Sequence, residues 1–136
     1  MIDAFLARVS EWAARSPGVR GLLLVGSHAR GEARPDSDVD LILLCDSVTA
    51  LVADPSWTSR FGPVTRIAVE DWGRVTSIRA WYDDGREVEF ALATLDWATR
   101  PDAGTRRVLE DGYRVLLDRE GVLGSLELAA TARPSR

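Results

Sequence analysis

The chain has 136 residues, which fits one ordinary domain, and 46% of them are hydrophobic, so it can bury a core. Its formal net charge is −4, every basic residue is an arginine, and there is no basic run. This balance argues against a protein that holds long nucleic acid through its phosphates. Cys45 is the only cysteine, which excludes an intrachain disulfide and a cysteine-rich metal site.

The sequence also predicts where the protein is found. Arg8 and Glu11 interrupt any apolar signal-peptide core near the N-terminus. No apolar run approaches the roughly 20 residues that span a bilayer. We therefore expect a cytoplasmic protein without a membrane partner.

Hydrophobic periodicity predicts an amphipathic helix over residues 2–13, which Ser16-Pro17-Gly18 ends. Further helices are expected over residues 28–33, 47–53, 105–111 and 122–131, with a frayed tail at 133–136. Apolar or alternating runs predict strands over residues 19–25, 37–45, 64–69, 75–82, 87–93 and 113–117, with a turn at 83–85. The pattern predicts one α/β domain of residues 1–136, with a mixed β-sheet and helices packed mainly on one face.

Two carboxylates, Asp38 and Asp40, stand at the head of the second predicted strand. Residues i and i+2 of a strand point to the same face, so these side chains are expected side by side. Two like charges held that close are unfavourable unless a cation lies between them. The pair therefore predicts part of a divalent metal site, and Mg²⁺ is the hard cation that bridges carboxylates and substrate phosphates.

A glycine-serine pair, Gly26-Ser27, ends the first predicted strand. Glycine allows a sharp turn and a close approach of the backbone to a ligand. Backbone N–H groups after the turn, with the Ser27 hydroxyl, can hold phosphate oxygens. Ser27 could instead only cap the short helix that follows.

These two elements together, with ten residues between Ser27 and Asp38, resemble the signature of the DNA polymerase β-like nucleotidyltransferase superfamily. The strings Gly-Ser-His-Ala-Arg-Gly at 26–31 and Ser-Asp-Val-Asp-Leu at 37–41 are similar to its minimal members. The resemblance implies a nucleotidyltransferase-like domain that transfers a nucleoside monophosphate, AMP from ATP, to a hydroxyl acceptor. It also implies two Mg²⁺ ions and a nucleotide contact from Arg30.

The resemblance further implies a third carboxylate on a later strand, for which Glu89 is the best match and Glu87 the second. If Val88 and Phe90 face the helices, both glutamates lie on the other face. Ala91 and Ala93 share that face and would leave room for a nucleotide. Glu89 is thus expected to complete the catalytic and metal-binding set with Asp38 and Asp40.

A second resemblance covers residues 54–97 and points to streptomycin-type aminoglycoside adenylyltransferases, through Asp-Pro-Ser-Trp at 54–57 and Phe-Gly at 61–62. It suggests an aminoglycoside as the acceptor. The alternative acceptor is a protein, since minimal members of the superfamily often pair with a helical protein in toxin–antitoxin modules. We therefore expect either a helical partner or a homodimer to cover one side of the cleft.

Other interpretations stay open from the sequence. His28 occupies a variable position of the motif and is interpreted as a loop-surface residue rather than a base. Arg34 could contact phosphate or only solvate its loop. Trp12 is expected in the core, whereas the other four tryptophans could be core or could line an acceptor pocket. The rival function is a non-catalytic nucleotide-binding or partner-binding module, for example an antitoxin-like subunit.

Overall fold

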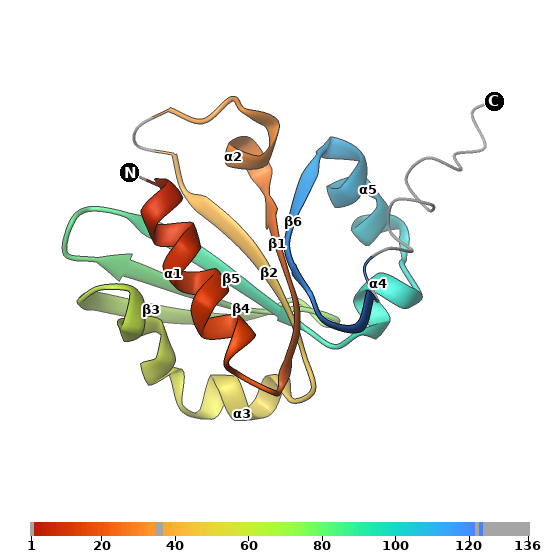
Figure 1. Cartoon of the computed structure of the whole chain (residues 1–136), viewed down its shortest axis with the longest axis horizontal. Coiled ribbons are helices and arrows are strands. Elements are labelled where there is room, and N and C mark those ends of the chain that lie inside the picture. The colour runs from red at the N-terminus through yellow and green to blue at the C-terminus, as the bar shows by residue number, and fades with distance from the viewer. Residues whose placement is uncertain (1, 35–36, 122, 124–136) are drawn as a thin grey trace.

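The computed structural model describes residues 2–34, 37–121 and 123, which form one six-stranded sheet with helices on both of its faces (Figure 1). The helices are α1 (Ile2–Ala14), α2 (Gly26–Arg30), α3 (Val48–Ala53), α4 (Asp96–Thr99) and α5 (Ala103–Asp111), with 3₁₀ turns η1 (Pro55–Phe61) and η2 (Arg119–Gly121). The strands are β1 (Val19–Val25), β2 (Val39–Cys45), β3 (Val64–Asp71), β4 (Thr76–Tyr82), β5 (Glu87–Ala93) and β6 (Tyr113–Asp118).

The sheet is mixed, as predicted. Its strand order is β3-β4-β5-β2-β1-β6, and β2 with β5 is the parallel pair, whereas the other neighbours are antiparallel. This parallel pair brings the head of β2, which carries Asp40, beside the head of β5, which carries Glu89. The sheet topology therefore positions the candidate site.

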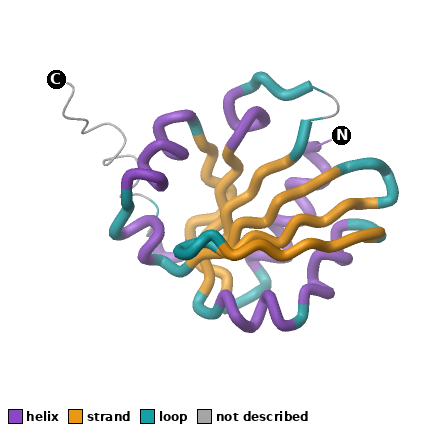
Figure 2. Tube along the Cα trace, turned by 180° about the vertical axis from the view of Figure 1, so that it is seen from behind, coloured by secondary structure: helices purple, strands orange, loops and turns teal. Residues whose placement is uncertain are grey.

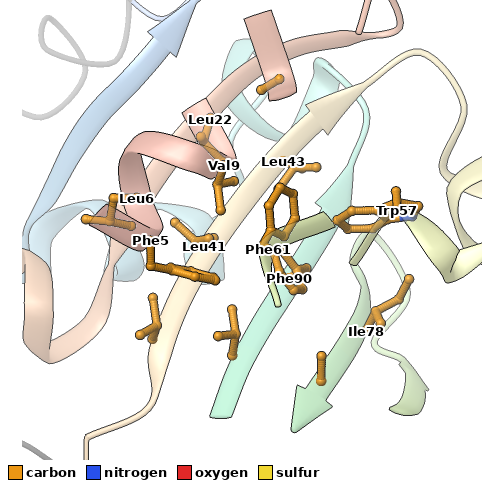
Figure 3. Packing of buried hydrophobic residues seen from close by; sticks show 14 of the residues in the cluster. Phe5, Leu6, Val9, Leu22, Leu41, Leu43, Trp57, Phe61, Ile78 and Phe90 are labelled. Carbon is orange, nitrogen blue, oxygen red and sulfur yellow. The ribbon is translucent and has the colours of Figure 1, made fainter. Parts of the chain in front are cut away.

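The larger core lies between the sheet and the layer formed by α1, α3 and η1. The apolar face of α1 contributes Phe5 and Val9, and η1 adds Trp57 and Phe61. Figure 3 shows these rings and aliphatic side chains gathered against β2 and β5. Trp57 packs edge-to-face on Phe90, with ring centroids 5.0 Å apart. This packing holds β5 with its alternate residues, Glu87 and Glu89, turned to the opposite face.

On that opposite face, α4 and α5 cover only the part of the sheet around β1, β2 and β5. Their side chains Trp97 and Leu109 join a second buried cluster with Leu23, Ile42 and Ala93. Figure 2 views the molecule from behind and shows the strands at the β3 end of the sheet uncovered, with α4 and α5 at the other end. The two faces of the sheet thus differ: one is closed by helices and the other is partly open.

Most predicted elements are confirmed within a residue or two, and three predictions are corrected. The helix expected over 28–33 lies at Gly26–Arg30, because Gly31 adopts a left-handed conformation with φ 72° and ends it. The strand expected from residue 37 begins at Val39, so Asp38 precedes it. Ala93 leaves no room for a ligand, because it is fully buried.

The remaining expectations concern other parts of the chain. The turn η1 and the helix α4 were not predicted. Apart from residue 123, the helix expected over 122–131 and the tail at 133–136 lie outside the described residues. Within the described part, no helix combines the length and apolar character needed to cross a bilayer.

Candidate active site

The turn from β1 into α2 places backbone directly against a carboxylate. Gly26 has φ 75°, a conformation that favours glycine. A Cβ placed on Gly26 would lie 3.2 Å from Cγ and 3.3 Å from Cβ of Asp40, and closer still to its Oδ2. Val25, the residue before the turn, is the register partner of Asp40 in the antiparallel β1–β2 pair. The predicted glycine turn and the predicted carboxylate are therefore in contact.

Asp40 and Glu89 are register partners in the parallel β2–β5 pair. Their side chains lie on the face opposite the larger core, since Val39, Leu41, Val88 and Phe90 all point into that core. The structure thus brings together two of the three carboxylates that the sequence predicted.

Asp38 reaches the same cluster through an arginine that sequence reasoning missed. Arg79, at the middle of β4, places Nη1 3.3 Å from Oδ2 of Asp38 and Nη2 2.8 Å from Oε1 of Glu89. The same Nη1 lies 2.6 Å from Oε2 of Glu87. One guanidinium therefore pairs with three carboxylates, from the loop before β2 and from β5.

A second residue of β4 also contacts the cluster. The hydroxyl of Ser77 donates to Oε2 of Glu89 at 2.8 Å, so each oxygen of that carboxylate has a donor. A signal for both β4 residues exists in the sequence. Ser77 and Arg79 occupy the positions of β4 that alternate with the buried Ile78 and Ala80, which places them on the face of Glu89.

Among the carboxylates of the cluster, Asp40 has a raised pKa. The pKa of Asp40 is raised from 3.8 to about 6: burial is the largest cause, the nearby carboxylates of Glu89 and Asp38 add to it, and Arg79 and Arg30 act in the opposite direction. Burial and like charges both disfavour the ionised form. A carboxylate in this environment is stabilised by an added cation, which is the condition that the sequence predicted for the site.

A cavity of about 230 Å³ opens beside Asp40 and Glu89. Its wall includes Gly26, Arg30 and Ala91, and α5 contributes Asp111. Ala91 therefore borders open space as expected, in contrast to Ala93. Asp111 was not predicted as a site residue, because its place depends on how α5 packs over β1 and β2. The glycine turn at Gly26, the motif residue Arg30 and the carboxylates of Asp40 and Glu89 therefore all line one cavity.

The other motif residues of α2 lie close by. Ser27 is the second residue of α2, and the helix has no side-chain cap, so the capping alternative for this serine is wrong. Arg30 forms an ion pair with Glu32, in which Nε lies 2.9 Å from Oε1, and Arg30 also borders the cavity. His28 is half-buried, with Nε2 3.4 Å from the carbonyl oxygen of Ser37, so it links α2 to the segment before β2 rather than lying free on a loop surface.

The tryptophans separate into core and surface. Trp12 stacks on Trp57 with centroids 4.9 Å apart, and Trp97, a residue of α4, is buried. Trp72 is 63% exposed in the β3–β4 turn. Trp81 lies on the site face of β4, with the guanidinium carbon of Arg66 4.6 Å from its ring centroid. Trp81 is thus placed to contact a molecule on the open face, whereas Trp12, Trp57 and Trp97 belong to the buried clusters.

The carboxylates offer suitable ligands for Mg²⁺, although their arrangement is not that of a closed metal site. Within residues 2–34, 37–121 and 123, no three His, Cys, Asp or Glu side chains converge closely enough to hold a metal ion. Asp38 and Glu89 nevertheless share one cation, the guanidinium of Arg79. Hard carboxylate oxygens that already share a positive charge fit the donor set that Mg²⁺ prefers.

The mixed sheet, the glycine turn and the facing carboxylates define a nucleotidyltransferase-like α/β fold. The chain belongs to the streptomycin adenylyltransferase family, whose model matches residues 2–133. Both resemblances inferred from the sequence are thereby confirmed at the level of family and superfamily.

Two similar proteins illustrate the relationship. The bifunctional uridylyltransferase/uridylyl-removing enzyme of Thiobacillus denitrificans is 33% identical over 96 residues, which are 71% of this chain and 9% of that enzyme. An aminoglycoside 6-adenyltransferase from Bacillus subtilis shares the fold, with a TM-score of 0.56 and 14% identity, over 74% of this chain and 39% of that one. The chain thus spans less than half of either protein.

Proposed function

We propose that this protein is a Mg²⁺-dependent nucleotidyltransferase that moves a nucleoside monophosphate, AMP from ATP, to a hydroxyl group of an acceptor. The observation that carries the proposal is the contact between the glycine turn at Gly26 and Asp40, with Glu89 as the register partner of Asp40. The family match supports the same reaction class.

In this proposal each motif residue has a defined task. Asp38, Asp40 and Glu89 hold Mg²⁺, two ions in all, which supplies charge neutralisation for the triphosphate and the departing pyrophosphate. The backbone at Gly26 and the hydroxyl of Ser27 seat phosphate oxygens, because the glycine lets the chain approach closely. Arg30 lies on the cavity wall and adds a positive charge for the nucleotide.

The chemistry is an in-line substitution at the α-phosphorus of ATP. The acceptor oxygen forms the new bond to phosphorus, while the bond from phosphorus to the oxygen that bridges to the β-phosphate breaks. Pyrophosphate leaves with the electron pair, and the hydroxyl proton passes to Glu89. Catalysis would then consist mainly of positioning and charge neutralisation.

For the acceptor we propose a small cationic molecule with hydroxyl groups, of the aminoglycoside type. The open face beside the cavity supports this choice, since the three carboxylates of Asp38, Glu87 and Glu89 gather there around the guanidinium of Arg79. A protein acceptor from a helical partner is the alternative, and the experiment below distinguishes the two.

The test uses ATP labelled at its α-phosphate, Mg²⁺, and a panel of aminoglycosides beside a control without acceptor. We expect label transfer to an aminoglycoside by the wild type, and none by Asp40→Asn, which keeps the side-chain shape but loses the charge. Asp83→Asn is the matched control, because Asp83 is an exposed carboxylate in the β4–β5 turn. It should transfer label like the wild type.

Other outcomes assign the protein differently. Label found only on protein, when a cell extract is added, would favour a protein acceptor. A wild type that neither transfers label nor binds ATP in the presence of Mg²⁺ would contradict the enzyme proposal and favour the non-catalytic module. Full activity of Asp40→Asn would contradict the assigned site while leaving the fold assignment intact.

A further inference from the structure

Arg79 lies among the carboxylates to which the proposed function assigns a metal. Its guanidinium is bonded to Asp38 and Glu89, two of those three ligands, and to Glu87, which is not one of them. The Arg79 side chain is only 24% exposed, so these pairs are partly shielded from water. A cation therefore already lies between two groups that a metal would have to share.

The three contacts of Arg79 with carboxylates differ in length, and the shortest is with the glutamate that is not a proposed metal ligand. Its shortest contact, 2.6 Å, is with Glu87, whereas Asp38 is 3.3 Å away. Glu87 pairs in register with Trp81 and does not border the cavity. Glu87 can thus keep the guanidinium paired if Asp38 and Glu89 turn to another cation. A charged side chain with a second partner can exchange ligands without being left unpaired in a partly buried place.

We propose that Arg79 is an internal counter-ion that competes with the metal: it holds Asp38 and Glu89 in place before Mg²⁺ binds, and gives them up to Mg²⁺ while Glu87 retains it. The inference rests on the proposed function, because it takes those carboxylates as the metal ligands. Arg79 is a positioning residue in this view, since it acts through the carboxylates.

The physical reason is that one site cannot easily hold both positive charges. An opposite charge within about 4–6 Å stabilises the ionised carboxylates, and a second cation added there is repelled by the first. Among the described residues no three carboxylates converge on one point, while Arg79 bonds two of the proposed ligands. Arg79 therefore opposes the convergence of these carboxylates on a metal, and we expect it to release at least one of them when the metal binds.

The test measures metal binding directly, without any nucleotide or turnover. Mn²⁺, a spectroscopically visible substitute for Mg²⁺, is titrated into the wild type, Arg79→Gln and Arg79→Lys, with affinity read by electron paramagnetic resonance and calorimetry. We expect Arg79→Gln to bind Mn²⁺ at least about tenfold more tightly, because a repelling charge is removed. Arg79→Lys keeps the charge and should stay near the wild type.

A matched control is available on the same face of the sheet. Arg66 lies on β3 opposite Trp81, and its guanidinium is placed over the ring of that tryptophan. Arg66→Gln removes the same charge from the protein but not from the cluster. It should leave the Mn²⁺ affinity unchanged, which separates a local effect from a change in net charge.

Thermal unfolding gives a second readout. In EDTA, Arg79→Gln should melt below the wild type, because its carboxylates repel one another, and Mn²⁺ should raise its melting temperature more than that of the wild type. If the single variant does not fold without metal, Arg79→Gln/Glu87→Gln keeps the wild-type net charge and the three proposed ligands. That double variant should also bind Mn²⁺ more tightly than the wild type.

The outcomes separate the two proposals. If the wild type binds Mn²⁺ and Arg79→Gln binds it equally or more weakly, Arg79 does not compete and the inference is overturned, while the proposed function stands. If none of these proteins binds Mn²⁺, alone or with ATP, the metal site of the proposed function fails and the inference fails with it.

Discussion

Gly26→Ala is the substitution that tests the contact on which the candidate site depends. Gly26 has φ 75°, and an added Cβ would lie 3.2 Å from Cγ of Asp40 and 3.3 Å from its Cβ. The new methyl group therefore meets both an unfavourable backbone conformation and a half-buried carboxylate. Because β1 and β2 are paired at this point, neither backbone can easily move away.

The expected loss in the free energy of unfolding of Gly26→Ala is the sum of these two effects. A non-glycine residue in the left-handed region costs roughly 1–2 kcal/mol. Overpacking by one methyl group in a well-packed place costs typically about 1–3 kcal/mol more. Gly31→Ala is the matched control, because Gly31 has φ 72° but no atom lies within 4 Å of the position that a Cβ would take there. It should lose only the backbone component, roughly 1–2 kcal/mol.

Urea unfolding of both variants measures the difference, which should be about 1–3 kcal/mol. The double variant Gly26→Ala/Asp40→Ala completes a thermodynamic cycle, and the loss from Gly26→Ala should shrink when the carboxylate is gone. We also expect Gly26→Ala to abolish transfer of the labelled nucleotide, and Gly31→Ala to retain more of it. Equal losses of stability in the two single variants, with no coupling to Asp40, would refute the contact.

Three further predictions concern the rest of the fold. Trp57→Ala should lower the free energy of unfolding by about 3–5 kcal/mol, measured in urea, because the ring is buried against Trp12 and Phe90; Trp72→Ala, at an exposed position, should change it by less than about 0.5 kcal/mol. Burial raises the pKa of the Cys45 thiol to about 11, so Ellman's reagent at about pH 8 should react slowly with the native protein and rapidly in urea, and a fast native reaction would contradict its burial. Hydrogen bonds from Thr105, backbone N–H first, and the nearby Arg74 lower the pKa of Asp102 to about 2, so the contribution of Asp102 to stability is present above the unfolded pKa of about 3.9 and is lost as pH falls through about 2. The unfolding midpoints of wild type and Asp102→Ala should therefore differ at about pH 5 and converge near pH 2, and a difference that does not depend on pH would argue against the charge.

The strands could be predicted because their patterns are strong and local. β1 and β5 have the predicted bounds, since apolar residues and clear turn signals enclose each of them. The short helical turns were harder to predict from the sequence. Pro55–Phe61 was not predicted as a helical turn, and only tertiary packing shows that Trp57 and Phe61 fill the space beneath α1. A seven-residue 3₁₀ segment has too few turns to display a period of its own.

Asp38 and Asp40 were predicted from their spacing and Glu89 from the family resemblance, but the counter-ion of these carboxylates was not predicted. Asp40, Glu89 and Gly26 stand in motif positions that sequence alone can identify. Arg79 stands in no motif, and its role comes from the hairpin register, which pairs it with Glu89. The turn at residues 83–85 in principle predicts that pairing, because a tight turn determines which residues of its two strands face each other.

Strand register distinguishes Glu87 from Glu89 as the partner of Asp40, which the alternation of side chains along β5 cannot do. Both glutamates have the same parity, so the alternation of β5 places both on the open face and cannot rank them. They differ by two residues along the strand, or about 6.6 Å, so only one of them can be the register partner of Asp40. The parallel pairing sets Glu89 beside Asp40. Glu87 does not border the cavity, and its Oε2 lies 2.6 Å from Nη1 of Arg79. In the functions proposed above, the two carboxylates therefore have different tasks: Glu89 is a metal ligand beside Asp40, whereas Glu87 keeps the guanidinium of Arg79 paired when Asp38 and Glu89 turn to the metal.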